Sequence, residues 1–295
     1  MKIFKTIQSI KKRHEKNVVV ALLCEVYIRM YQIHFLRPIL RFAFKKESPR
    51  GWVFVTGCYN AGTTVVKNAI GLHPDISSAP IEGDVLTSAM PNFEQGGFPR
   101  GMYGNAVAIR LHREFGSINR ELAQSDWRPW IFKNKFFCDK SISQTVRIGL
   151  LRESFNNSRF VCVTRNPDNV VGGIQKRSVP NKQATVILGS KTYPDCFLKK
   201  QWAFIYGLVL RDYDEEDTFF CSYEDFVSNP AKTVGQLYSF LNLRPVDITI
   251  VGHSILVHGK KLSIRPPMTK PTDTFRSYGS IKLMVNKINL NREIS

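Results

Sequence analysis

A glycine-rich segment close to residue 60 has the spacing of a phosphate-binding loop. Its residues, Gly57-Cys58-Tyr59-Asn60-Ala61-Gly62-Thr63-Thr64, follow an apolar run at 52–56 and precede a segment of helical period at 64–72. Backbone N–H groups at the start of a helix, together with threonine hydroxyls, hold phosphate groups. The spacing is that of a Walker A loop without its lysine, which predicts binding of one terminal 5′-phosphate group. An ordinary glycine-containing turn between a strand and a helix is the alternative interpretation.

An arginine follows another apolar run farther along the chain. Arg165 comes directly after the strand-like residues 159–164 and just before Pro167, where the pattern predicts the start of a helix. The N-terminus of a helix favours negative charge, and a guanidinium forms charge-assisted hydrogen bonds with phosphate. Arg165 is therefore a candidate phosphate ligand, with a surface salt bridge as the alternative.

The acidic and cysteine residues show no pattern of metal ligands. No predicted strand ends in a convincing Walker B aspartate, so magnesium-dependent nucleotide chemistry is disfavoured and no metal is expected. The six cysteines form no C-x-x-C pair, and four of them lie in or beside strand-like runs. We interpret them as thiols in a reducing compartment, which predicts a cytoplasmic protein.

These residues lie in a chain that alternates strand-like runs with helical segments. Strands are expected at 52–56, 131–138, 159–164 and 218–222, and helices at 64–72, 105–123, 144–155, 167–176, 195–213 and 231–241. Residues 83–104 and 179–193 are expected to be irregular. This order predicts an α/β fold in which a P-loop-like parallel sheet is flanked by helices on both faces, in a single domain at 51–250. The site is then expected at the carboxyl ends of the strands.

The two ends of the chain carry most of its positive charge. The net charge of the 295 residues is +18, and residues 1–50 hold 12 basic against 3 acidic side chains, residues 251–295 8 against 2. Because 43% of the residues are hydrophobic, a disordered chain is excluded. Residues 1–50 are expected to form a basic helical extension packed on the body, with peripheral membrane contact as the alternative. Glu25 and Arg29 interrupt its apolar stretch too early for a spanning helix.

In their order along the chain, these motifs resemble those of the sulfotransferases, which use 3′-phosphoadenosine 5′-phosphosulfate (PAPS). The resemblance covers residues 51–243 and rests on the loop at 57–64 with His73-Pro74, the segment 159–167, and Tyr223-Glu224-Asp225-Phe226 with Asn229-Pro230. The spacing to Glu82 and the Lys140-Ser141 segment are more similar to the tyrosylprotein and bacterial carbohydrate branches.

The resemblance implies a role for each matching residue. The donor would be bound around its 5′-phosphosulfate by Asn60, Ala61, Gly62, Thr63 and Thr64, at its 3′-phosphate by Arg165, and beside its adenine by Tyr223. A simple core aromatic is the alternative for Tyr223.

The resemblance also implies the catalytic groups. Glu82 would be the general base that deprotonates the acceptor hydroxyl, and Lys140 would neutralise the leaving phosphate. The basic segment 251–295 would close over the nucleotide, through Ser263 or Arg265. Solvated surface charge is the alternative interpretation of Glu82, of Lys140 and of this segment.

Two positions depart from the family pattern. Asn60 stands where the family usually has Lys or Arg, and Gly173 stands where a Ser commonly assists at the 3′-phosphate. Lys67, Lys176 and Arg177 are nearby cations that would compensate. Either Asn60 is a simple loss of charge, in which case Asn60→Lys strengthens donor use, or its amide is itself adapted to the site.

The sequence thus predicts a PAPS-dependent sulfotransferase that acts on a hydroxyl of a glycan, glycolipid or similar acceptor, with no nucleic-acid partner. A nucleotide kinase-like enzyme is the rival in another class, and the missing Walker lysine argues against it. The nonenzymatic rival is a protein that binds nucleic acid or a membrane surface through its basic ends, around a decayed donor site.

Overall fold

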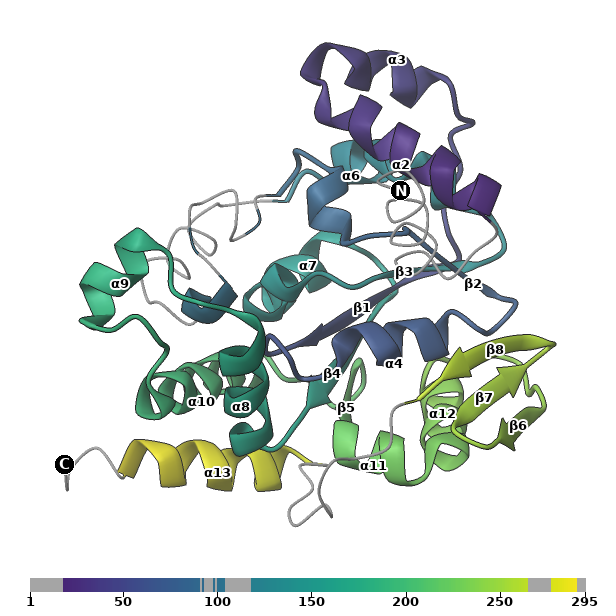
Figure 1. The fold of residues 1–295 in the computed structure, drawn as a ribbon. Coiled ribbons are helices and arrows are strands. Elements are labelled where there is room, and N and C mark those ends of the chain that lie inside the picture. Colours follow the sequence, from purple (N-terminus) through teal and green to yellow (C-terminus); the bar gives the residue numbers. More distant parts are fainter. Residues whose placement is uncertain are drawn as a thin grey trace.

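The core of the protein is a five-stranded parallel sheet in the order β2-β3-β1-β4-β5 (Figure 1). The computed structural model describes residues 18–90, 92, 98, 100–103, 118–264 and 277–290. The strands are β1 (Gly51–Gly57), β2 (Ile76–Ser78), β3 (Phe136–Asp139), β4 (Ser158–Thr164) and β5 (Thr218–Ser222). The central strand β1 is buried along its whole length because its apolar side chains face helices on both sides. The predicted single α/β domain with a parallel sheet is confirmed.

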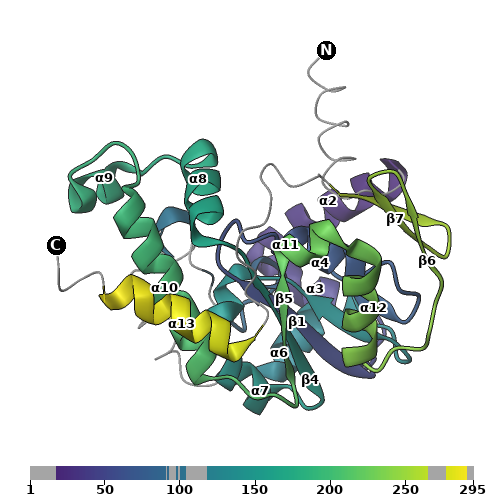
Figure 2. The same cartoon turned by 90° about the horizontal axis from the view of Figure 1, so that it is seen from below.

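Helices cover both faces of this sheet (Figures 1 and 2). On one face α4 (Thr63–Ile70) packs on β1 and on α12 (Pro230–Phe240), and α11 (Tyr223–Ser228) follows β5. On the other face lie the 3₁₀ helix η5 (Ile142–Val146), α7 (Ile148–Ser154) and α10 (Asp195–Arg211). The helix α8 (Pro167–Arg177) packs on α10, and α13 (Tyr278–Leu290) runs along α10. These layers bury a continuous core and leave the carboxyl ends of the strands at one edge.

Three predicted elements differ from the structure. The strand expected at 131–138 begins only at Phe136, since the preceding residues form a turn in which Lys135 N–H donates to the Phe132 carbonyl (3.0 Å). The helix expected at 144–155 is divided at Arg147, where η5 ends and α7 begins. The loop expected at 179–193 is wrong, because it contains α9 (Lys182–Leu188).

The irregular segment expected at 83–104 contains two short 3₁₀ helices, η2 (Gly83–Leu86) and η3 (Arg100–Met102). Residues 91, 93–97, 99 and 104 of this segment lie outside the described part. Most of the helix expected at 105–123 also lies outside it, and α6 (Arg120–Asp126) occupies its end, followed by η4 (Arg128–Trp130).

Further elements precede and follow the central domain. Before β1 lie α2 (Val18–Gln32), the 3₁₀ helix η1 (His34–Leu36) and α3 (Arg37–Phe42). After α12, a small antiparallel sheet is formed by β6 (Ile248–Val251), β7 (Ser254–Val257) and β8 (Lys260–Ser263). In the ranges that the structure describes, no helix has the length and hydropathy needed to cross a bilayer.

Candidate functional site

A cavity of 740 Å³ opens at the carboxyl ends of the parallel strands. It brings together side chains that lie far apart in the sequence, because the loops after β1, β3, β4 and β5 meet at this edge. Of the residues predicted for the site, Ala61 is buried beneath the loop, and the others line the cavity: Asn60, Gly62, Thr63, Thr64, Glu82, Lys140, Arg165 and Tyr223. Ser263 also lines it, whereas Arg265 lies outside the described residues.

The glycine-rich loop has the shape of an anion cradle. Gly62 has φ 101° and immediately precedes α4, whose first residues are Thr63 and Thr64. A Cβ atom at Gly62 would lie 2.3 Å from the Tyr223 ring, so both the backbone conformation and this contact require glycine. The start of α4 therefore presents N–H groups and threonine hydroxyls at the cavity, with Tyr223 packed against the loop.

Arg165 lies beside this loop with part of its guanidinium unused. Its Nη1 donates to the carbonyl oxygen of Asn60 (3.0 Å), and the guanidinium stacks 4.4 Å from the centre of the Tyr223 ring. The backbone carbonyl of Arg165 is held by the indole N–H of Trp202 (3.0 Å). Its Nε is buried and has no hydrogen-bond partner within the described chain. Burial lowers the pKa of Arg165, which means that a bound anion would stabilise its charge.

The side chain of Asn60 fills the space that Gly173 leaves open. A Cβ atom at Gly173 would lie 1.7 Å from Asn60 Nδ2, which donates to the carbonyl of Val170 (3.3 Å). Asn60 Oδ1 accepts from Arg177 Nη1 (2.6 Å), and Arg177 lines the cavity. The two departures from the family pattern are therefore one local rearrangement, since a larger residue at 173 would collide with Asn60.

Of the three cations considered as substitutes, Arg177 alone lines the cavity. Lys67 donates to the backbone carbonyl of Ala79 (2.9 Å), and the side chain of Lys176 is exposed on α8. Arg177 and Arg165 approach Asn60 from two sides, and the charge of Arg177 contributes to the lowered pKa of Arg165.

On the opposite side of the cavity, Glu82 and Lys140 form an ion pair. Lys140 Nζ donates to Glu82 Oε1, and the Glu82 side chain is 37% exposed while that of Lys140 is 12% exposed. Glu82 follows β2 and Lys140 follows β3, and these strands are parallel neighbours. The pairing of the strands therefore places a proton acceptor and a cation side by side.

A buried polar cluster beneath this pair was not anticipated from the sequence. Asp84 is buried and lines the cavity; its Oδ2 accepts from Ser143 Oγ, and its Oδ1 has no hydrogen-bond partner in the described part of the chain. Burial, reinforced by the charge of Glu82, raises the pKa of Asp84 to about 7. Asp84 lies only two residues after Glu82, but an aspartate in a glycine-rich segment is typical of a turn, so the sequence gives no reason to place it in the site.

Two further charged groups complete this cluster. Asp139 accepts hydrogen bonds from Gly83 N–H (2.7 Å) and Ser141 Oγ (2.9 Å), and burial raises its pKa. Arg147 is also buried, and its guanidinium makes no hydrogen bond to the described residues. Burial lowers the pKa of Arg147 to about 10, against the opposing effect of Asp84 and Asp139. The carboxylates beneath the cavity are thus balanced by charge rather than by a direct hydrogen bond from Arg147.

The acidic, histidine and cysteine side chains of the described residues form neither a metal-ligand cluster nor a disulfide. Among the residues that the structure describes, no group of three or more His, Cys, Asp or Glu side chains is arranged to hold a metal ion. The cysteines with described side chains, Cys58, Cys138, Cys162, Cys196 and Cys221, are free thiols.

Comparison with known proteins identifies the family. Residues 53–247 match the profile of the sulfotransferase family, whereas no curated protein sequence matches the chain significantly. A sulfotransferase domain from the curacin biosynthetic pathway is 17% identical, with a TM-score of 0.44 over 68% of this chain and 76% of that one. A sulfotransferase from Alicyclobacillus acidocaldarius is 15% identical, with a TM-score of 0.45 over 67% and 83% of the two chains. Sulfotransferase STF9 from Mycobacterium avium is 15% identical, with a TM-score of 0.42 over 75% and 68%. Because the profile matches more than half of its length, the chain belongs to the sulfotransferase family.

Proposed function

We propose that this sulfotransferase transfers the sulfuryl group of PAPS to a hydroxyl of a carbohydrate or similar acceptor. The observation that carries the proposal is a single cavity with guanidinium groups on one side and the Glu82–Lys140 pair on the other. An anionic donor and a hydroxyl acceptor need opposite surroundings, and this cavity offers both.

The donor is assigned to the side of the glycine-rich loop. The N–H groups and hydroxyls at Thr63 and Thr64 suit the 5′-phosphosulfate, and the guanidinium of Arg165, which lines the cavity, suits the 3′-phosphate. Arg177 adds a second guanidinium within reach of the same anion. Contact of Tyr223 with adenine stays a prediction; its ring already packs on Gly62 and under Arg165.

Glu82 and Lys140 are assigned the proton and the charge of the transfer. The bond between sulfur and the 5′-phosphate oxygen breaks while a bond between sulfur and the acceptor oxygen forms. Glu82 takes the proton of the acceptor hydroxyl, and Lys140 neutralises the phosphate oxygen that keeps the electron pair of the broken bond. Their ion pair keeps the Glu82 carboxylate oriented toward Lys140.

The polar groups beneath Glu82 favour an acceptor rich in hydroxyls. Asp84 lines this wall of the cavity, and a carboxyl group there suits a second hydroxyl of the same acceptor. Sugars offer several hydroxyl donors at close spacing, so a glycan or the sugar of a glycolipid suits this wall of the cavity.

Titration calorimetry with adenosine 3′,5′-bisphosphate, AMP and ATP·Mg tests the donor assignment. We expect the bisphosphate to bind without magnesium and roughly tenfold or more tighter than AMP, since a hydrogen bond to a charged group contributes about 1.5–3 kcal/mol. Equal affinity for AMP and the bisphosphate would refute the PAPS site, and preference for ATP·Mg would favour the kinase-like rival. Transfer of labelled sulfate from PAPS to a panel of glycans then tests the acceptor class.

A further inference from the structure

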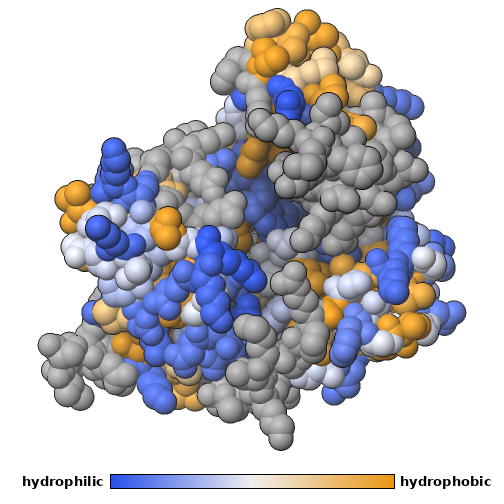
Figure 3. All heavy atoms as spheres, viewed as in Figure 1, coloured by the Kyte–Doolittle hydropathy of each residue, from blue (hydrophilic) through white to orange (hydrophobic). Residues whose placement is uncertain are grey.

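The helices α2 and α3 expose two apolar stripes that the fold does not use. Val26, Met30 and Ile33 recur at the spacing i, i+4, i+7, and so do Phe35, Ile39 and Phe42, so each set occupies one side of a helical segment. Phe35 is 75% exposed, Ile39 63% and Phe42 89%. We call these six residues the outer face of the α2–α3 hairpin, which forms the hydrophobic cap at the top of Figure 3.

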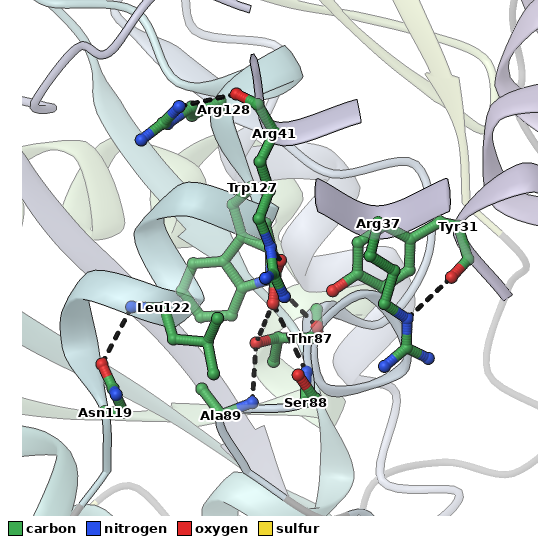
Figure 4. Close-up of polar contacts among 12 residues, drawn as sticks. Tyr31, Arg37, Arg41, Thr87, Ser88, Ala89, Asn119, Leu122, Trp127 and Arg128 are labelled. Carbon is green, nitrogen blue, oxygen red and sulfur yellow. Dashed lines mark hydrogen bonds and ion pairs between the residues drawn. The ribbon is translucent and has the colours of Figure 1, made fainter. Parts of the chain in front are cut away.

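The opposite side of the hairpin is fastened to the body of the protein (Figure 4). Arg41 Nε donates to Oδ1 of the fully buried Asp126 (2.6 Å), and Thr87 Oγ1 donates to Asp126 Oδ2 (2.8 Å). Arg128 Nη1 donates to the backbone carbonyl of Arg41 (2.6 Å). Tyr31 is buried on this inner side as well. The hairpin is therefore held in one orientation at the edge of the domain (Figure 1), and the six residues of its outer face are exposed.

The charges around the outer face are almost all positive. Residues 18–47 contain five basic and two acidic side chains. Of these, Arg41 is paired with Asp126 on the inner side, Glu25 is buried, and Glu47 accepts a hydrogen bond from the Lys133 N–H (2.9 Å). Arg29 lies exposed on α2, and Lys45 and Lys46 lie exposed directly after α3. Exposed aromatic and aliphatic side chains beside lysines are typical of helices that lie in a lipid interface.

This charge selects among the surfaces that could cover an apolar face. A second copy of the chain would bring two positively charged hairpins together, which opposes association. A neutral protein groove would satisfy the apolar residues but leave the lysines without partners. Anionic lipid satisfies both, because headgroup phosphates attract lysines while the acyl boundary accepts Phe and Ile side chains.

We propose that the outer face of the α2–α3 hairpin binds the surface of an anionic phospholipid membrane. Phe35, Ile39 and Phe42 insert between the headgroups, and Lys45 and Lys46 pair with lipid phosphates. This inference stands apart from the sulfuryl-transfer proposal, since none of these residues lines the cavity.

Vesicle sedimentation of the full chain tests the proposal. Vesicles of phosphatidylcholine with roughly one third phosphatidylglycerol should bind the protein at least about tenfold more tightly than vesicles of phosphatidylcholine alone. This affinity should fall as the salt concentration rises. Phe35→Gln, Ile39→Gln and Phe42→Gln combined should lower the partition coefficient at least about tenfold, since three inserted side chains are lost. Lys45→Glu with Lys46→Glu should remove the preference for the anionic vesicles.

The matched control is Leu283→Gln on α13, which removes an equally exposed apolar residue far from the hairpin and should not change binding (Figure 1). Circular dichroism and bisphosphate binding should be the same for all variants, which separates loss of the membrane surface from loss of fold or donor site. The proposal would be overturned if the parent protein bound neither kind of vesicle, or if the triple variant bound the anionic vesicles as tightly as the parent. A parent dimer that the triple variant converts to monomer would instead assign the face to self-association.

Discussion

The two sides of the cavity come from opposite halves of the sheet and differ in their charged groups, with two arginines on one side and the Glu82–Lys140 ion pair above the buried Asp84 on the other. The loops after β1, β4 and β5 supply Arg165 and Tyr223 and position Arg177, whereas the loops after β2 and β3 supply Glu82, Asp84 and Lys140. In the strand order β2-β3-β1-β4-β5, the cationic side lies toward β5 and the carboxylate side toward β2.

Burial acts on the two sides in opposite directions. It lowers the pKa of Arg165 on the cationic side and raises the pKa of Asp84 to about 7 on the carboxylate side. A bound anion would therefore stabilise the charge of Arg165, and a hydrogen-bond donor would stabilise the carboxylate of Asp84. Strand order therefore sets which charged side chains share a side of the cavity.

The largest expected effect comes from Glu82→Gln on the carboxylate side. The substitution keeps size and polarity but removes the proton acceptor, so turnover should fall by about 10²- to 10⁴-fold while bisphosphate affinity stays nearly constant. Initial rates of sulfate transfer and calorimetry measure the two quantities. Glu153→Gln, at an exposed position on α7, is the matched control. A loss smaller than about tenfold would mean that another group deprotonates the acceptor.

Arg165→Ala tests the cationic side in the same way. It should remove most of the preference for the bisphosphate over AMP, on the order of 1.5–3 kcal/mol, because the charged donor to the 3′-phosphate is lost. Arg211→Ala, which removes a half-exposed arginine of α10, should leave that preference unchanged. If Arg165→Ala weakens the binding of AMP and of the bisphosphate equally, Arg165 contacts a part of the nucleotide other than the 3′-phosphate.

Asn60→Lys was expected to strengthen donor use if Asn60 is a simple loss of charge, and the structure favours the opposite result. Asn60 has φ 69°, and its amide is held by Val170 and Arg177. A lysine there loses these contacts and adopts a left-handed backbone, at a cost in unfolding free energy on the order of 1–2 kcal/mol. Thermal unfolding and calorimetry should show lower stability and no gain in bisphosphate affinity.

A double variant tests whether the residues at positions 60 and 173 depend on each other. Gly173→Ser alone should destabilise the protein because its side chain collides with Asn60. Combined with Asn60→Ala, which removes the amide that the serine would meet, Gly173→Ser should cost less than the sum of the two single changes. Strict additivity would mean that Asn60 and Gly173 are independent departures.

The last expected effect is a change in the pH dependence of stability with Asp84→Asn. In the unfolded chain the Asp84 carboxyl has a pKa of about 3.9, so the folded state binds its proton more tightly. The contribution of Asp84 to the free energy of unfolding is therefore greatest at low pH and is lost as pH rises through about 7. The charges of Glu82 and Asp139 raise the pKa of Asp84 further, and the charge of Arg147 opposes them. The variant cannot ionise, so its melting temperature relative to the parent should rise between about pH 4 and about pH 7. A difference that stays flat across this range would show that Asp84 ionises normally.

Local pattern was enough to predict most strands of the sheet and the turn between β1 and α4. The apolar runs that became β1, β4 and β5 and the spacing around Gly62 depend on neighbouring residues, so they can be read along the chain. Glu82 and Lys140 were placed through the family resemblance, and the structure brings them together because β2 and β3 pair. The N-cap of α9 at Asn181 was equally local and was overlooked.

The chain by itself determined the order of strands, loops and helices, because apolar periodicity and glycine spacing act over a few residues. Tertiary structure alone decided which charges share a wall of the cavity, since strand order is set by packing between distant segments. It also decided the burial that raises the pKa of Asp84 and the fit of Asn60 into the space above Gly173, 113 positions later. Desolvation and steric fit depend on atoms brought together only by folding, and no spacing in the sequence records them.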